Sequence, residues 1–334
     1  MRKILVLLLP LFLMGSPLSA LEIEEEAGKG AVSSTQPVER GGILASGRLV
    51  IEPSFQYSRS SAHRININGW TIFEAIHIGQ IEVSKIDRDF FLPSLSLRYG
   101  LKNLEFNVRV PALYRADREI APVEGTRKEI DISGGGLGDI EGNIYYHMVR
   151  EGRNTPDIIL SVGAKSRTGR DSYSLKKAKV ADKLPSRVVE FPTGTGHWGF
   201  SGGLTLAKTS DPAVVYLNSR YYYNTSREVG EQRGTNYGEI DLGDSFEYTL
   251  GMGFALNERI SINTFFNQRF TGKTRQNGRK LVETGSTVAT LNIGVTHSLF
   301  PSMPFEVVVQ IGLTEDSPDV AVQFRLPYTF LGRR

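Results

Sequence analysis

The most regular feature of the chain is an alternation of apolar and polar residues, seen best near the C-terminus. The apolar members of that last segment are Val320, Val322, Phe324, Leu326, Tyr328 and Phe330. A period of two places successive side chains on opposite faces of a β-strand. The same period recurs in 104–110, 246–254 and 305–313. The pattern therefore predicts an all-β protein whose strands each have one apolar face.

The lengths of the connectors indicate what kind of all-β fold this is. Strand-like segments occupy 48–59, 86–99, 103–115, 138–149, 156–167, 197–208, 212–224, 244–256, 258–270, 286–299, 304–313 and 319–330. After the second segment, short turns alternate with longer polar loops. That asymmetry is typical of an outer-membrane barrel, whereas a water-soluble sandwich does not require it. We expect a transmembrane antiparallel β-barrel of about 12 strands.

One interval leaves the strand count open. Residues 60–85 contain an apolar run through Ile78, which begins at Trp70. A folded extracellular loop, a plug inside the barrel and an additional hairpin all fit this run. The hairpin would raise the count to about 14 strands.

The N-terminus indicates export. Arg2 and Lys3 precede an apolar stretch at 4–13, and Ser19-Ala20 offers small residues for cleavage. This is the layout of a secretory signal peptide. We therefore expect a signal peptide at 1–20, a polar periplasmic leader at 21–47, the barrel at 48–330 and a short extension at 331–334, in the outer membrane of a Gram-negative cell.

Composition limits the chemistry. The 334 residues carry a formal net charge of +3, which gives no indication of nucleic-acid binding. Cysteine is absent, so disulfides and thiolate metal sites are excluded. The five histidines form no metal-type pair, and 194–199 matches a dinucleotide-binding glycine pattern without the helix that such a site needs. We expect no cofactor, no metal and no catalytic residue.

Charged residues at inward positions carry the functional hypothesis. The alternation points twelve of them into the lumen: Glu52, Arg98, Glu105, Arg109, Glu141, Lys165, Arg167, Arg220, Glu247, Arg269, Glu306 and Arg325. Unpaired charges in an apolar interior are costly. The interior is therefore either filled with water or internally salt-bridged, and the mixed signs argue against strong ion selectivity.

Four prolines interrupt the predicted wall. Pro53, Pro93 and Pro111 fall on the first three strands, and Pro327 falls on the last. Proline donates no hydrogen bond to a β-ladder, so these strands should contain bulges or weak pairing. A lateral exit between the first two strands is a further hypothesis.

Several local motifs resemble a known family. Leu137-Gly138-Asp139-Ile140, leading to Tyr145-Tyr146, and then Arg167-Thr168-Gly169 resemble the pattern of the outer-membrane β-barrel family named for the meta-pathway of phenol degradation. The segment 312–330 is similar to that family's final hairpin, and the likeness covers about 41–330. This chain departs from the family at Arg167, where proline is common, and continues past Phe330. The resemblance implies an outer-membrane barrel with a role in transport.

Three functional classes remain open. The first is a passive outer-membrane channel for small, hydrophobic or aromatic solutes. The second is a structural or assembly barrel with a plugged lumen, and the third is a membrane-embedded hydrolase. The expected partners are outer-membrane lipid, an unidentified small solute and the barrel-assembly machinery, which would read an insertion signal formed by Phe324, Leu326, Tyr328 and Phe330. No nucleic-acid partner is expected.

Overall fold

The computed structural model describes residues 43–60, 64–67, 70–73, 85–123, 126–178, 187–188, 190–232, 235–282, 284–300 and 303–331. The predicted signal peptide and most of the predicted leader, 1–42, lie outside these residues, as does the end of the predicted extension, 332–334. Within the described residues, no helix is both long and apolar enough to cross a membrane.

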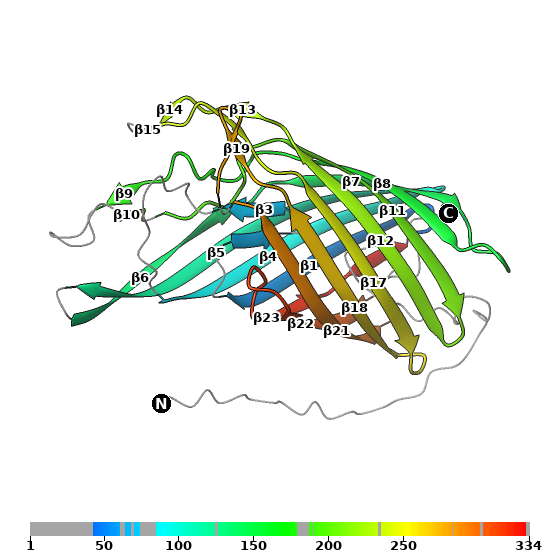
Figure 1. The fold of residues 1–334 in the computed structure, drawn as a ribbon. Helices are drawn as coiled ribbons and strands as arrows, with labels where there is room; N and C mark the ends of the chain where they lie inside the picture. Colours follow the sequence, from blue (N-terminus) through cyan, green and yellow to red (C-terminus); the bar gives the residue numbers. More distant parts are fainter. Residues whose placement is uncertain are drawn as a thin grey trace.

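The described strands close into an antiparallel barrel of 12 (Figure 1). In order around the wall they are β1 (Arg48–Ser60), β4 (Lys85–Leu101), β5 (Leu104–Val123), β7 (Glu141–Val149), β8 (Asp157–Lys165), β11 (Gly199–Ser210), β12 (Ala213–Asn224), β17 (Ser245–Ala255), β18 (Ile260–Thr271), β21 (Ser286–Phe300), β22 (Met303–Gly312), and a last strand made of β23 (Val320–Arg325) and β24 (Tyr328–Leu331). Both β23 and β24 pair with β1, which closes the barrel. The predicted fold class is confirmed, with 12 barrel strands rather than 14.

The outer face of the wall is apolar. Leu95, Val162 and Leu250 are each at least half exposed, at 50%, 58% and 53%, although they lie in the middle of their strands. Exposed aromatic side chains lie toward both ends, among them Tyr221 at the loop end and Tyr99 at the turn end. An apolar band between two aromatic girdles is the lipid-facing surface of a transmembrane barrel. The protein is therefore an outer-membrane barrel.

The long-loop end contains more strand than the sequence predicts. A long polar loop was expected between the predicted strands 103–115 and 138–149, but β5 continues to Val123 and pairs with β6 (Thr126–Leu137), a hairpin that projects beyond the barrel (Figure 1). That prediction is wrong because strands outside the membrane need no apolar face, so the alternation disappears there. In the interval 60–85, β2 (Arg64–Ile67) and β3 (Trp70–Phe73) form a separate hairpin outside the barrel sheet.

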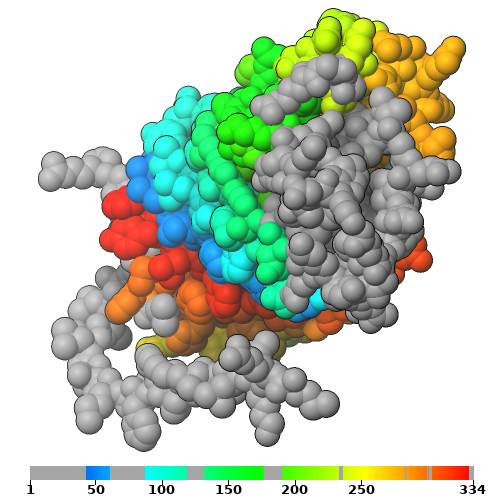
Figure 2. All heavy atoms as spheres, turned by 90° about the vertical axis from the view of Figure 1, so that its left-hand side faces the viewer, coloured from blue at the N-terminus to red at the C-terminus, as the bar shows by residue number. Residues whose placement is uncertain are grey.

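Smaller sheets form a cap at the same end. The segments β13 (Arg227–Glu228), β16 (Glu239–Asp241), β19 (Arg275–Gln276) and β20 (Arg279–Lys280) make one sheet, while β9 (Lys177–Ala178) pairs with β10 (Arg187–Val188) and β14 (Glu231–Gln232) with β15 (Thr235–Asn236). Figure 2 looks onto this end, where the yellow-green and orange segments meet at the rim. A buried cluster that includes Tyr173, Tyr237 and Ile240 packs this cap together.

The prolines interrupt the wall without opening a seam between β1 and β4. That ladder runs unbroken through Pro53 and Pro93, from Leu49 opposite Tyr99 to Ser60 opposite Arg88. The β4–β5 ladder skips Leu92 and Pro93. The last strand is also interrupted, at 326–327, where the Leu326 N–H still donates to the Pro53 carbonyl at 3.1 Å. These prolines therefore mark local irregularities, and the proposed exit between the first two strands has no gap to use.

Candidate functional site

The candidate site is the interior of the barrel. Of the twelve charged residues expected there, ten are buried inside it: Glu52, Arg98, Glu105, Glu141, Lys165, Arg220, Glu247, Arg269, Glu306 and Arg325. Arg109 is half-buried and lines the same interior. Arg167 is exposed and does not join them, because β8 ends at Lys165 and the alternation no longer fixes the direction of later side chains.

The strand register sets these charges side by side with opposite signs. Arg109 on β5 lies opposite Glu141 on β7, and Glu141 lies opposite Lys165 on β8. Beyond β11, Arg220, Glu247 and Arg269 are aligned on three consecutive strands in the same way. Oppositely charged side chains directly across a strand pair attract each other. The interior is therefore cross-linked by charge as well as by backbone hydrogen bonds.

Near the short turns, ion pairs form a layer across part of the lumen. Arg98 donates two hydrogen bonds to Glu105, at 2.7 and 3.1 Å, and its third nitrogen lies 3.7 Å from Glu52. Arg325 lies 3.0 Å from Glu306, which also accepts a hydrogen bond from the Asn263 amide. Because Glu105 and Glu306 are completely buried, these pairs stabilise charges that would otherwise lie in the barrel without compensation.

The chain enters this layer just before β1. The Leu44 backbone N–H donates to the Glu105 carboxylate at 2.9 Å, and Ile43 packs on lumen-facing side chains that include Tyr145 and Tyr216. The carbonyl groups of Leu44 and Ala45 also lie so close to Gly100 that no Cβ would fit there. The sequence predicts a polar linker at 21–47, but the structure places its described end inside the barrel, because Ile43 is apolar and Glu105 needs donors.

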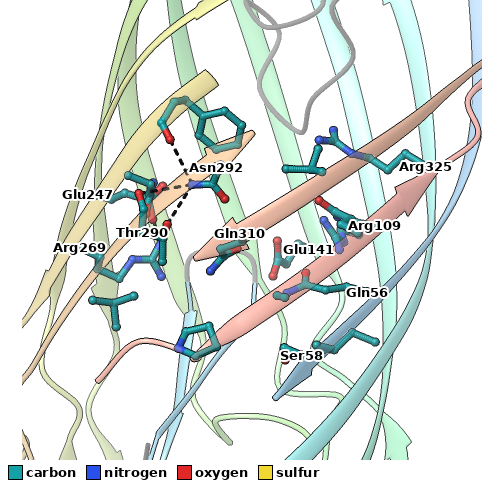
Figure 3. A pocket seen from close by; sticks show the side chains of 18 of the residues that line it. Gln56, Ser58, Arg109, Glu141, Glu247, Arg269, Thr290, Asn292, Gln310 and Arg325 are labelled. Carbon is teal, nitrogen blue, oxygen red and sulfur yellow. Dashed lines mark hydrogen bonds and ion pairs between the residues drawn. The ribbon is translucent and has the colours of Figure 1, made fainter. Parts of the chain in front are cut away.

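Above this layer lies a polar cavity of about 220 Å³. Its lining includes seven of the predicted lumen residues: Glu52, Arg109, Glu141, Arg220, Glu247, Arg269 and Arg325. Figure 3 shows Arg109, Glu141 and Arg325 pointing into it from one side, with Arg269 and Glu247 on the other. Gln310 and Asn292 add neutral hydrogen-bonding groups. A lining of this kind can hold water and exchange hydrogen bonds with a polar solute.

At the loop end, Asp139 holds three segments together. Its carboxylate accepts hydrogen bonds from the Gly169 and Thr195 backbone N–H groups, at 2.9 and 2.8 Å, and lies 3.2 Å from the Lys165 ammonium. The two motifs that carry the family resemblance meet here, because Thr168 donates to the Gly138 carbonyl at 2.9 Å. Their common feature is thus a structural clamp at the rim of the barrel.

The sequence analysis did not predict that Asp139 joins these segments, although a repeated tripeptide that contains the aspartate was present. Leu242-Gly243-Asp244 repeats the Leu137-Gly138-Asp139 tripeptide before another strand. Asp244 accepts hydrogen bonds from the Asn224 backbone N–H and from the Tyr221 hydroxyl, at 3.0 and 2.6 Å. The repeat indicates a shared rim contact at the start of β7 and β17.

Two of the described histidines, His147 and His197, are held in structural contacts. His147 lies 2.8 Å from Asp157, which also accepts the Glu151 backbone N–H. His197, in the cap, donates from Nδ1 to the Thr225 carbonyl at 2.8 Å and accepts from the Tyr173 hydroxyl at Nε2. Burial lowers the pKa of His197 to about 4, so this side chain is neutral at pH 7.

Comparison with known proteins places the chain in a family. Residues 71–330 match the family described as "Putative MetA-pathway of phenol degradation". The chain belongs to this family. An outer-membrane channel of Pseudomonas putida F1 has a similar fold, with a TM-score of 0.61 and 12% identity over 86% of this chain and 97% of the other. The β domain of the Bordetella autotransporter BrkA matches less well, with a TM-score of 0.44 and 10% identity over 85% and 100% of the two chains.

Proposed function

We propose that this member of the MetA-pathway family is a passive outer-membrane channel for small solutes. The cavity in the lumen carries the proposal. Side chains from strands on opposite sides of the wall line it, and they combine charged, amide and hydroxyl groups. A solute that leaves water needs replacement hydrogen bonds, which side chains of this kind can supply.

The periplasmic end supplies the resistance to passage in this proposal. The Arg98–Glu105 pair and the docked Ile43–Leu44 segment narrow the lumen below the cavity. The ion pairs belong to the wall, whereas Leu44 is held there by its backbone hydrogen bond to Glu105 and by the packing of Ile43. We infer that this segment undocks when solute passes, while the ion pairs stay in place.

The second candidate is a structural barrel with a permanently closed lumen, which the same periplasmic layer favours. A swelling assay separates the two functions. Proteoliposomes that contain the purified protein should swell in iso-osmotic small sugars or amino acids, at rates that fall as solute size rises. Rates equal to those of protein-free liposomes for every solute would support the closed barrel and contradict the channel.

We also propose that the barrel-assembly machinery reads the last strand. Phe324, Tyr328 and Phe330 are exposed on the lipid-facing side, while Leu326 is partly covered at the break between β23 and β24. The rings of Tyr328 and Phe330 lie 4.6 Å apart, in an edge-to-face arrangement. The proposed partners of the outer face are therefore outer-membrane lipid and the assembly machinery.

A further inference from the structure

A loop segment folds against the inner face of the wall at the loop end of the barrel. Residues 191–197 lie between β10 and β11, belong to no strand and are all buried. A Cβ added at Gly134 would lie 3.7 Å from the Phe191 ring. Gly134 is paired with Arg115, whose side chain is buried and faces inward, whereas the preceding Tyr114 is exposed on the outside. The segment therefore lies on the inner face of the β5–β6 hairpin.

Phe191 is one member of a stack of three side chains. The central carbon of the Arg115 guanidinium lies 4.3 Å from the centroid of the Phe191 ring and 5.5 Å from the centroid of the Phe90 ring. Phe90 is directly across from Arg115 in the ladder between β4 and β5, and it lines the cavity. A guanidinium is attracted to the face of an aromatic ring at such distances. The stack therefore extends from the cavity lining to the loop segment on one side of the lumen.

The wall side of the stack is held by an ion-pair cluster. Arg115 donates from Nε to the Asp117 carboxylate at 2.6 Å, and the Arg88 Nε lies 3.4 Å from the same carboxylate. All three side chains are at most 9% exposed. Charge-assisted hydrogen bonds of this kind fix the orientation of the guanidinium plane as well as its position. Arg115 therefore presents a fixed flat face to Phe191.

The loop side of the stack is fixed as well. The Thr193 backbone N–H donates to the Arg170 carbonyl at 3.0 Å, and the Arg170 backbone N–H donates to the Thr193 hydroxyl at 2.9 Å. On the other side of Phe191, the Glu190 carboxylate lies 3.1 Å from the Lys176 ammonium. The segment is thus held two residues after Phe191 and one residue before it, so the fold sets the position of the ring.

We propose that this stack is the entry constriction of the lumen, and that the Phe191 ring sets the largest solute that reaches the cavity from the loop end. Pore diameter is one of the features by which channels select what passes. A ring that is held from both sides narrows the passage by its own width. The constriction rests on the proposed function, since it gives the channel a size limit, yet access to the cavity can be measured without passage through the membrane.

A single cysteine in the cavity measures that access. The chain has no cysteine of its own, and Ser96→Cys is nearly isosteric at a buried position in the cavity lining. Its rate of modification is followed in purified, detergent-solubilised protein with N-ethylmaleimide and with the bulkier N-cyclohexylmaleimide. Both reagents are uncharged, so that only size is varied. Entry past the periplasmic layer is the same whether or not Phe191 is present, so a change in rate reports entry from the loop end.

We expect Phe191→Ala, added to Ser96→Cys, to raise the rate with N-cyclohexylmaleimide at least tenfold and the rate with N-ethylmaleimide less than threefold. Unchanged rates with both reagents would show that Phe191 does not restrict entry. An increase of the same factor with both reagents would show a general loosening of the barrel and no size limit. Either result would overturn the proposal.

Further variants locate the constriction. Phe200→Ala is the matched control, because it removes the same ring from the lipid-facing loop end of β11, and it should leave both rates unchanged. Arg115→Lys should raise the rate with the bulkier reagent by a smaller factor than Phe191→Ala, since lysine keeps the charge beside Asp117 but lacks the flat guanidinium. The heat-dependent shift of the barrel in gel electrophoresis checks that each variant is folded. Should Phe191→Ala fail to fold, Phe191→Trp decides: its larger ring should slow the bulkier reagent at least threefold, and an unchanged rate contradicts the proposal.

Failure of the constriction and failure of the channel are distinguishable. Modification that depends on Phe191, in a protein that does not swell liposomes, would contradict the channel and leave the constriction standing. Swelling by a protein in which Phe191→Ala changes neither rate would leave the channel standing and overturn the constriction.

Discussion

Replacing Leu44 with proline removes the backbone N–H that ties the start of the described N-terminal segment to Glu105. That N–H donates to Glu105, which is completely buried and keeps its two hydrogen bonds from Arg98 in the variant. Proline has no N–H to donate. Leu44→Pro should therefore release the segment while leaving the ion-pair layer intact.

The expected shift toward the undocked state follows from the charge of the acceptor, the Glu105 carboxylate. A hydrogen bond to a charged group contributes roughly 1.5–3 kcal/mol. Since about 1.4 kcal/mol corresponds to a tenfold change in an equilibrium constant, loss of this bond should shift the docked-to-undocked ratio roughly 10- to 150-fold toward the undocked state. Packing of Ile43 opposes part of that shift, so the lower half of the range is expected.

The assay is single-channel recording in planar bilayers, comparing the wild type with Leu44→Pro at the same protein load. We expect a higher open fraction or a larger conductance for the variant. Ser46→Ala, at an exposed position in the same turn, is the control and should behave as the wild type. If folded Leu44→Pro shows the same open fraction and conductance as the wild type, Leu44 does not restrict the lumen and the reasoning fails.

Other perturbations test the remaining parts of the structure. Val309→Arg on the lipid face of β22 should destabilise the barrel by roughly 2–4 kcal/mol, measured by urea unfolding in lipid vesicles. Gln310→Arg, one residue later in the cavity lining, should cost much less. Equal costs would contradict the assignment of Val309 to the lipid and Gln310 to the lumen. Phe330→Ala should lower the amount of protein in the outer membrane, and unchanged levels in isolated membranes would remove the insertion signal. Because the pKa of His197 falls to about 4 in the fold from about 6.5 when unfolded, the cap should lose up to about 3 kcal/mol as pH drops from 6.5 to 4, and be fully stable above 6.5. Limited proteolysis of 166–198 should report that loss, and His197→Gln should abolish its pH dependence.

The barrel itself was predictable because the membrane imposes its pattern. Each crossing must show apolar side chains to lipid and is free to show polar ones to the lumen, so a period of two persists for the whole crossing. Phe324 and Arg325, which are neighbours in sequence, illustrate it: one is exposed on the outside and the other is buried inside. The same rule stops at the membrane surface, which is why the β5–β6 hairpin and the cap sheet were missed.

Which lumen charges form ion pairs was not predictable, because the pairing depends on strand register and on which of two neighbouring arginines binds a shared carboxylate. The sequence places Arg220, Glu247 and Arg269 inside, but only the structure shows that Glu247 pairs with Arg269 and leaves Arg220 with Asn143. The contact between Leu44 and Glu105 is also beyond a pattern-based prediction, since 61 residues separate its partners and it uses a backbone N–H. Arg167 shows the opposite error, an alternation extended past the end of its strand.

The most direct test of the central claim is the conductance of the purified wild-type protein in planar bilayers. The account predicts discrete current steps that scale with salt concentration and increase in Leu44→Pro. A complete absence of current steps for both proteins, after the heat-dependent gel shift has shown both to be folded, would contradict a permeable lumen.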